Sequence, residues 1–211
     1  MFRTIACLAC LVCVFGCGGG SGGGKTSVTV RIEETRFVPK HTTIASDGCV
    51  HWINVDAVPH QVVSGTLDPQ GSPLIIHAIQ ITLTGFNPIA LTGDLGDTVR
   101  FSNISGNPFT MDVVDDNGQL VSTVSFAIGE SKTFTFPGAG QFTFRQHGSS
   151  IFQGTIILYG QPNPNGLFIS PVLPNGEVFI AQFGSTGSLS YYDLDQTNPN
   201  RSFKTGIITV Q

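Results

Sequence analysis

The chain has 211 residues, of which 40% are hydrophobic, 11% are charged and 26 are glycine. A chain of this length and apolar content can bury a sizeable core in one or two domains, and it is too apolar to be intrinsically disordered. Ten basic and 14 acidic residues give a formal net charge of −4 with no basic cluster. This balance argues against a nucleic-acid groove, so no nucleic-acid partner is expected.

The first 16 residues have the pattern of a bacterial signal peptide. Arg3 precedes an apolar run, residues 5–15, which is too short to span a bilayer as a mature helix. Val14-Phe15-Gly16-Cys17 resembles the lipobox of bacterial lipoproteins, in which cleavage precedes the cysteine and its thiol carries diacylglycerol. We therefore expect removal of residues 1–16 and lipidation at Cys17. The alternative is ordinary secretion with cleavage in the glycine tract that follows.

A glycine-rich tether follows the expected lipidation site. Residues 18–24 are all glycine except Ser21, so the segment 17–26 is expected to be a lipidated cysteine on a flexible linker. A lipid on Cys17 would hold the folded part of the chain to a bilayer. The expected location is the bacterial cell envelope, facing the periplasm or the cell exterior, with the lipid bilayer as one partner.

From Ser27 onward the chain is typical of β-strands separated by turns. Short runs alternate apolar and polar residues and are bounded by Gly, Pro, Asn or Asp, for example Val28–Ile32, Val50–Trp52, Val99–Phe101 and Phe134–Phe136. No window of ten or more residues shows a capped helical period. The pattern predicts an all-β fold built as an antiparallel sandwich.

Two internal similarities reveal a repeat. The front half of one copy matches a stretch 49 residues further on without a gap, as in Phe37-Val-Pro39 with Phe86-Asn-Pro88, Asn54 with Asn103, and Gln70 with Gln119. The back half of the other copy matches at an offset of 47, as in Leu120 with Leu167, Gly129 with Gly176, and Phe144 with Tyr191.

The two offsets predict that one domain is inserted into a loop of the other. The outer domain comprises 27–70 and 167–211, the inserted domain comprises 74–160, and 71–73 and 161–166 are connectors rich in Pro, Gly and Asn. Loop tips accept insertions because few backbone hydrogen bonds are disturbed there. The rival arrangement, three pieces in line, would leave two half-sandwiches with open edges, which disfavours it.

Both copies resemble the cupredoxins, the plastocyanin-like copper proteins. The resemblance rests on a front half that reads Phe37-Val-Pro39, Asp47–Asn54 and Asp56-Ala-Val-Pro-His-Gln-Val62, and on back halves that read Gly140–Gly154 and Gly187–Gln196. It implies two Greek-key β-sandwiches. It also implies a blue copper centre, which uses two His, one Cys thiolate and a weak axial Met.

The inserted domain has lost every one of these ligands. Phe109 and Ser149 stand at the two His positions, Gln146 stands at the Cys position, and Phe152 stands at the Met position. His147 is next to the Cys position, but a shift of one residue along a strand points its side chain the other way. We therefore expect this loop cluster to serve packing and not metal binding.

The outer domain keeps one family ligand, His60. Asp193 stands at the Cys position, Gln196 at the second His position, and the Met position falls near Lys204. His60, Asp193 and Gln196, with Asp195 nearby, are the metal candidates, and they would suit a harder ion or a type-2-like copper. The alternative is a solvent-facing loop histidine beside two solvated aspartates. Cys49 cannot supply the thiolate, because it begins a strand that ends about 16 Å closer to His60.

The sequence therefore favours a cell-envelope lipoprotein that acts as a binding or scaffolding module for an envelope protein or ligand not yet identified. No nucleophile elbow or phosphate loop occurs, so no enzymatic activity is expected. No resident cofactor is expected either, because the thiolate and the second His are absent. The alternative is a periplasmic copper-binding or electron-transfer protein of the cupredoxin class with an atypical copper site at His60.

Overall fold

The computed structural model describes residues 26–71 and 74–211. The expected signal peptide 1–16, the lipidation site Cys17 and the tether up to residue 25 lie outside these ranges. All regular elements in the described ranges are strands, β1 to β18. Within those ranges, no helix has the length and apolar character needed to cross a bilayer.

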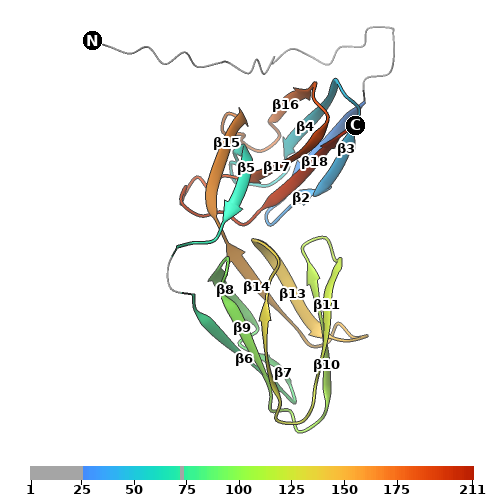
Figure 1. The fold of residues 1–211 in the computed structure, drawn as a ribbon, viewed down its shortest axis with the longest axis vertical. Helices are drawn as coiled ribbons and strands as arrows, with labels where there is room; N and C mark the ends of the chain where they lie inside the picture. The colour runs from blue at the N-terminus through green and yellow to red at the C-terminus, as the bar shows by residue number, and fades with distance from the viewer. Residues whose placement is uncertain (1–25, 72–73) are drawn as a thin grey trace, which may run out of the picture.

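The outer domain is a sandwich of two sheets, drawn in the upper part of Figure 1. The first sheet has the order β16-β4-β1-β2, and the second has the order β15-β5-β17-β18-β3. The strands are β1 (Ser27–Ile32), β2 (Phe37–Val38), β3 (His41–Ile44), β4 (Gly48–Asn54), β5 (Val62–Asp68), β15 (Gln161–Ile169), β16 (Val178–Phe183), β17 (Gly187–Asp193) and β18 (Thr205–Val210).

The inserted domain repeats this topology strand for strand in the lower part of Figure 1. Its sheets have the orders β12-β9-β6-β7 and β11-β10-β13-β14-β8. The strands are β6 (Ile76–Thr82), β7 (Gly85–Asn87), β8 (Ala90–Asp94), β9 (Thr98–Asn103), β10 (Phe109–Asp115), β11 (Leu120–Phe126), β12 (Ser131–Thr135), β13 (Gly140–Gln146) and β14 (Gln153–Tyr159). The expected fold class, two β-sandwiches with one inserted into a loop of the other, is confirmed. The expectation of a purely antiparallel sandwich is wrong, because each domain also contains two parallel pairs, β1–β4 and β18–β3 in the outer domain and β6–β9 and β14–β8 in the inserted one.

Each sandwich has its own aromatic core. In the outer domain, Trp52 packs edge-to-face on Tyr191, with ring centroids 5.3 Å apart. Tyr191 also lies across Gly206 of the neighbouring strand, where a Cβ would come within 2.2 Å of the tyrosine ring. Phe144 and Gly154 repeat this pairing in the inserted domain, at 2.3 Å. The aromatic ring and the facing glycine are therefore one packing unit, present once in each copy.

Residues 161–166 differ from their expected role as an irregular connector. They form the first part of β15 and pair with β5, with Pro162 opposite Leu67 and Pro164 opposite Gly65. Two prolines are tolerated here because β15 is the edge strand of its sheet, where backbone N–H groups need no partner strand. Pro and Gly composition suggested a loop, whereas pairing with β5 extends the sheet back to residue 161.

An ion pair joins the two domains on one side. Asp116, in the β10–β11 turn of the inserted domain, accepts a hydrogen bond from Lys40 Nζ at 2.8 Å, and its carbonyl accepts one from Arg36 at 2.6 Å. The Asp116 side chain is almost completely buried by these contacts. These contacts place the β10–β11 turn of the inserted domain against the segment that leads from β1 to β3 in the outer domain.

Candidate functional site

His60 lies in a loop that the structure buries. The residue follows β4 and precedes β5, and it exchanges two backbone hydrogen bonds with Leu173, at 3.1 and 2.7 Å. Only 4% of its surface is exposed. The alternative of a solvent-facing loop histidine is therefore wrong, because the side chain is buried.

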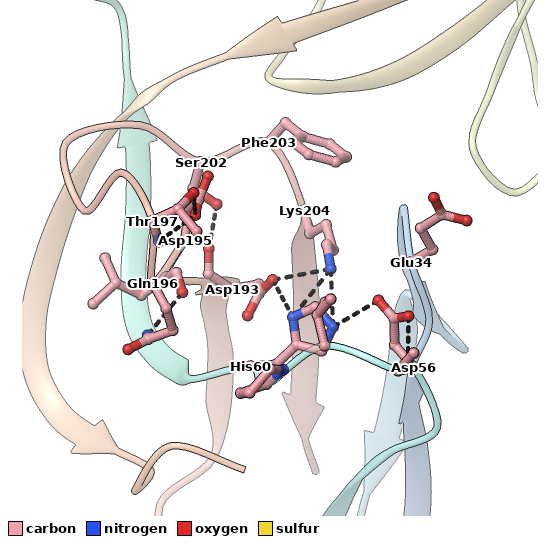
Figure 2. A pocket seen from close by; sticks show the side chains of 14 residues that line it. Glu34, Asp56, His60, Asp193, Asp195, Gln196, Thr197, Ser202, Phe203 and Lys204 are labelled. Carbon is pink, nitrogen blue, oxygen red and sulfur yellow. Dashed lines mark hydrogen bonds and ion pairs between the residues drawn. The ribbon is translucent and has the colours of Figure 1, made fainter. Parts of the chain in front are cut away.

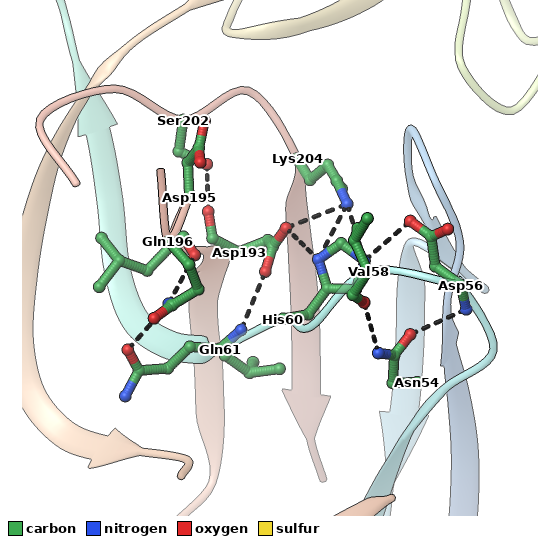
Figure 3. Close-up of polar contacts among 12 residues, drawn as sticks. Asn54, Asp56, Val58, His60, Gln61, Asp193, Asp195, Gln196, Ser202 and Lys204 are labelled. Carbon is green, nitrogen blue, oxygen red and sulfur yellow. Dashed lines mark hydrogen bonds and ion pairs between the residues drawn. The ribbon is translucent and has the colours of Figure 1, made fainter. Parts of the chain in front are cut away.

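The His60 ring is held between two carboxylates (Figure 3). Nδ1 lies 2.8 Å from Asp193 Oδ2, and Nε2 lies 2.9 Å from Asp56 Oδ2. Burial by itself raises the pKa of Asp56, but hydrogen bonds from His60 and from the Ala57 amide outweigh it, so the pKa lies below its ordinary value. Both ring nitrogens therefore have protein partners, which leaves neither free for another ligand.

A lysine ammonium lies beside the same histidine. Lys204 Nζ is 3.0 Å from Asp193 Oδ2 and 3.2 Å from His60 Nδ1, and it donates to the Glu33 carbonyl at 3.2 Å. The side chains of Lys204 and Asp193 are each only 6% exposed. Lys204 falls near the position of the family's axial Met. A metal ion bound by His60 Nδ1 and Asp193 would have to displace this ammonium.

The other predicted ligands point elsewhere. Gln196 hydrogen-bonds the Gln61 side chain at 3.2 Å and the Leu194 carbonyl at 3.0 Å. Asp195 accepts hydrogen bonds from the amide and hydroxyl of Thr197, both at 2.7 Å, which close its own loop. Figure 3 shows both side chains on the far side of Asp193 from His60. The structure thus brings His60 and Asp193 together, but neither Gln196 nor Asp195 joins them.

No group of three or more His, Cys, Asp or Glu side chains that could hold a metal ion is found among residues 26–71 and 74–211. The donor set at His60 also lacks a thiolate, and Cys49 is buried near the start of β4, at the opposite end from His60. A blue copper centre needs that thiolate together with a second His. The residues present therefore do not fit the copper centre that the family resemblance implies.

A cavity of about 690 Å³ opens beside this cluster (Figure 2). Its walls combine acidic and apolar side chains around His60 and Lys204, from Glu34, Asp56, Val58, Pro59, Asp193, Leu194, Asp195 and Phe203 among others. A cavity of this size with a few polar groups has the character of a small-ligand or side-chain binding site.

The inserted domain fixes the loop that forms one wall of the cavity. Phe203 packs edge-to-face on Tyr159, with ring centroids 5.3 Å apart. Arg201 pairs with Asp94 at 2.7 Å and lies over the Tyr159 ring at 4.2 Å from its centroid. Ser202 exchanges backbone hydrogen bonds with Gly160. Because Lys204 follows directly, its position depends on contacts with the second domain.

The corresponding positions of the inserted domain are used for packing. Phe109 packs edge-to-face on Phe86, with centroids 5.7 Å apart, and the Gln146 amide donates to the Phe152 carbonyl at 2.9 Å. His147 is largely exposed and lies 2.9 Å from Asp112 on the sheet surface. Phe109 thus packs against another ring, and Gln146 and Phe152 are joined by a backbone hydrogen bond.

Sequence reasoning missed two members of the outer cluster. The sequence places Lys204 near the axial Met position and Asp56 in the motif leading to His60, and it predicts no contact of either with the histidine ring. A signal for Asp56 was available, because it stands four residues before His60 in one loop. No local signal marks Lys204, which is 144 residues from His60 in the chain.

Comparison with known proteins finds similarity only among solved structures. No protein-family model matches the chain, and no curated protein matches it. An oxidised amicyanin variant is 15% identical, covering 46% of this chain and 97% of that chain with a TM-score of 0.36. Native pseudoazurin from Hyphomicrobium denitrificans is 17% identical, covering 42% of this chain and 77% of that chain with a TM-score of 0.34. Both are cupredoxins, and the likeness concerns the fold of about half of this chain.

Proposed function

We propose that the chain is a lipid-anchored cell-envelope protein that acts as a binding or scaffolding module and works without a blue copper centre. The observation that carries this proposal is the Lys204 ammonium beside His60 Nδ1 and Asp193. A positive charge in this place repels a metal ion and occupies the carboxylate that stands at the Cys position. The anchor is proposed from the lipobox-like sequence ending at Cys17.

Titration of the purified full chain with Cu(II) tests the copper-free role. We expect no intense visible absorption, because among residues 26–71 and 74–211 no cysteine lies beside His60 to give a copper–thiolate charge-transfer band. A strong band at about 600 nm, the range typical of copper–thiolate centres, would contradict the proposal.

The role of Lys204 needs its own variant. Lys204→Met removes the ammonium and leaves His60 Nδ1 and Asp193 Oδ2 without their cation, so calorimetry should show tighter Cu(II) binding by the variant than by the wild type. His60→Ala in the Lys204→Met background should abolish that gain. Equal Cu(II) affinity in wild type and Lys204→Met would mean that the ammonium does not control metal access.

Incorporation of labelled palmitate in a bacterial host tests the anchor. The wild-type chain should carry the label and sediment with membranes, whereas Cys17→Ser should do neither. Labelling of the Cys17→Ser variant would place the lipid elsewhere and refute the proposed lipidation site.

A further inference from the structure

One edge of the outer domain is unprotected. Strand β16 reads Val-Phe-Ile-Ala-Gln-Phe, pairs only with β4 among the described residues, and carries no charge and no proline. Its counterpart in the inserted domain, β12, carries Lys132, and the other edge strand on this side, β15, carries two prolines. Charges and prolines are the usual protection against strand pairing at a sheet edge.

The backbone of β16 has hydrogen-bonding groups that face outward. The Asn54 amide donates to the Glu177 carbonyl at 3.0 Å, and the register then makes Phe179 and Ala181 the residues that bond to β4. Val178, Ile180 and Gln182 therefore direct their N–H and C=O groups away from β4. No described residue bonds to these groups.

Two apolar cavities lie beside this edge. One, of about 390 Å³, is lined by Phe179 and residues 166–169 of β15. The other, of about 250 Å³, is lined by Ala181, Phe183 and Leu189 together with the uncharged polar side chains of Gln182, Ser185 and Thr186. Leu167 and Phe168 line both cavities. Neither lining contains a charged residue. The cavities therefore lie along the opening between the two sheets, on the side where β15 and β16 form the edges.

We propose that this edge binds an extended, uncharged, apolar segment of a partner protein, which adds to the sheet as a strand next to β16. The outward backbone groups of Val178, Ile180 and Gln182 would pair with the segment, and every second side chain of the segment would enter the apolar cavities. The segment must be uncharged, because a charge placed against these uncharged linings would lose its hydration without gaining a counter-ion.

A second copy of the chain fits this edge less well. Two β16 strands could pair edge to edge, but Phe179, Ala181 and Phe183 already pack into their own core and could not fill the cavities of the partner. The inference extends the proposed binding role to a surface distinct from the His60 cavity. Its test is independent of whether copper binds at His60.

The test is fluorescence polarisation of a labelled short peptide of alternating valine and threonine, titrated with the purified full chain. We expect saturable binding, and no binding of a version with a central proline. Ile180→Pro removes an outward N–H without breaking a bond to β4, so it should weaken binding at least about tenfold. Thr133→Pro makes the same change at the equivalent place on β12 and should leave binding unchanged.

A second variant covers the case in which Ile180→Pro fails to fold. Ala181→Leu fills the smaller cavity from inside and should also weaken binding, while a cooperative thermal transition shows that the domain is intact. Absence of peptide binding to the wild type, or equal binding by wild type and both edge variants, would overturn the proposal. Self-association that Ile180→Pro abolishes, without peptide binding, would assign the edge to a second copy and overturn the proposed occupant.

Discussion

Replacement of Lys204 by Met tests whether the buried ammonium holds the outer domain's cluster together. At the observed 3.0 Å from Asp193 Oδ2, the attraction between the two charges is about 5 to 6 kcal/mol at an effective dielectric constant of about 20. Methionine is unbranched and can occupy the lysine's path, so the main loss is the cation itself. Removing one partner of a buried ion pair typically lowers the free energy of unfolding by about 3 to 5 kcal/mol. Because His60 stays hydrogen-bonded to Asp193 in the variant, we expect a loss at the lower end of this range, about 3 kcal/mol.

Equilibrium urea unfolding of wild type and Lys204→Met measures this loss in the free energy of unfolding. Lys132→Met is the matched control, since that lysine is 42% exposed and its ion pair with Glu130 is 3.3 Å long. The control should change stability by less than about 1 kcal/mol. A loss below about 1 kcal/mol for Lys204→Met, similar to the control, would refute the argument that the ammonium is a buried partner of Asp193.

Two further predictions concern packing and pH. Gly206→Ala would place a methyl group 2.2 Å from the Tyr191 ring and should lower the free energy of unfolding of the outer domain by about 2 to 3 kcal/mol, measured in urea. Gly138→Ala is the control, because a methyl group there would have no atom within 4 Å and should change stability little. Equal losses of stability in the two variants would contradict the packing argument. Burial by itself raises the pKa of Asp97, but two backbone amides and His77 outweigh it, so the folded-state pKa lies below the unfolded value. Its stabilisation is therefore present above about pH 4 and is lost as the pH falls through the folded-state pKa, so the melting temperature of Asp97→Asn should fall less steeply than that of wild type in acid. If the melting temperatures of wild type and Asp97→Asn fall equally steeply as the pH is lowered, Asp97 makes no such contribution.

Much of the fold could be predicted because the chain repeats itself. The offset of 47 pairs Phe144 with Tyr191, and the structure gives these two rings the same place in equivalent sheets, each opposite a glycine of the neighbouring strand. The strand 161–169 could not be predicted, because its Pro and Gly composition indicates a loop. Its pairing partner, β5, lies almost 100 residues away in sequence.

The site was less predictable than the fold. The motif around His60 indicated its place in the loop, and the structure puts Asp193 2.8 Å from its ring. The predicted involvement of Gln196 depended on an alignment across a loop of different length, and the loop turns that side chain toward Gln61 instead. Loop conformation depends on hydrogen bonds such as those that Asp195 makes with Thr197, which a ligand motif does not specify.

The sequence by itself determined the alternation of strands, the two copies and the absence of thiolate at Gln146 and Asp193, because residue type and local period are properties of the chain alone. The tertiary structure decided what replaces the metal ligands. Lys204 reaches His60 only when β18 packs beside β17 and the inserted domain fixes the loop before it. Such a contact depends on the packing of sheets and domains, since short-range pattern carries no information about side chains that meet across the whole chain.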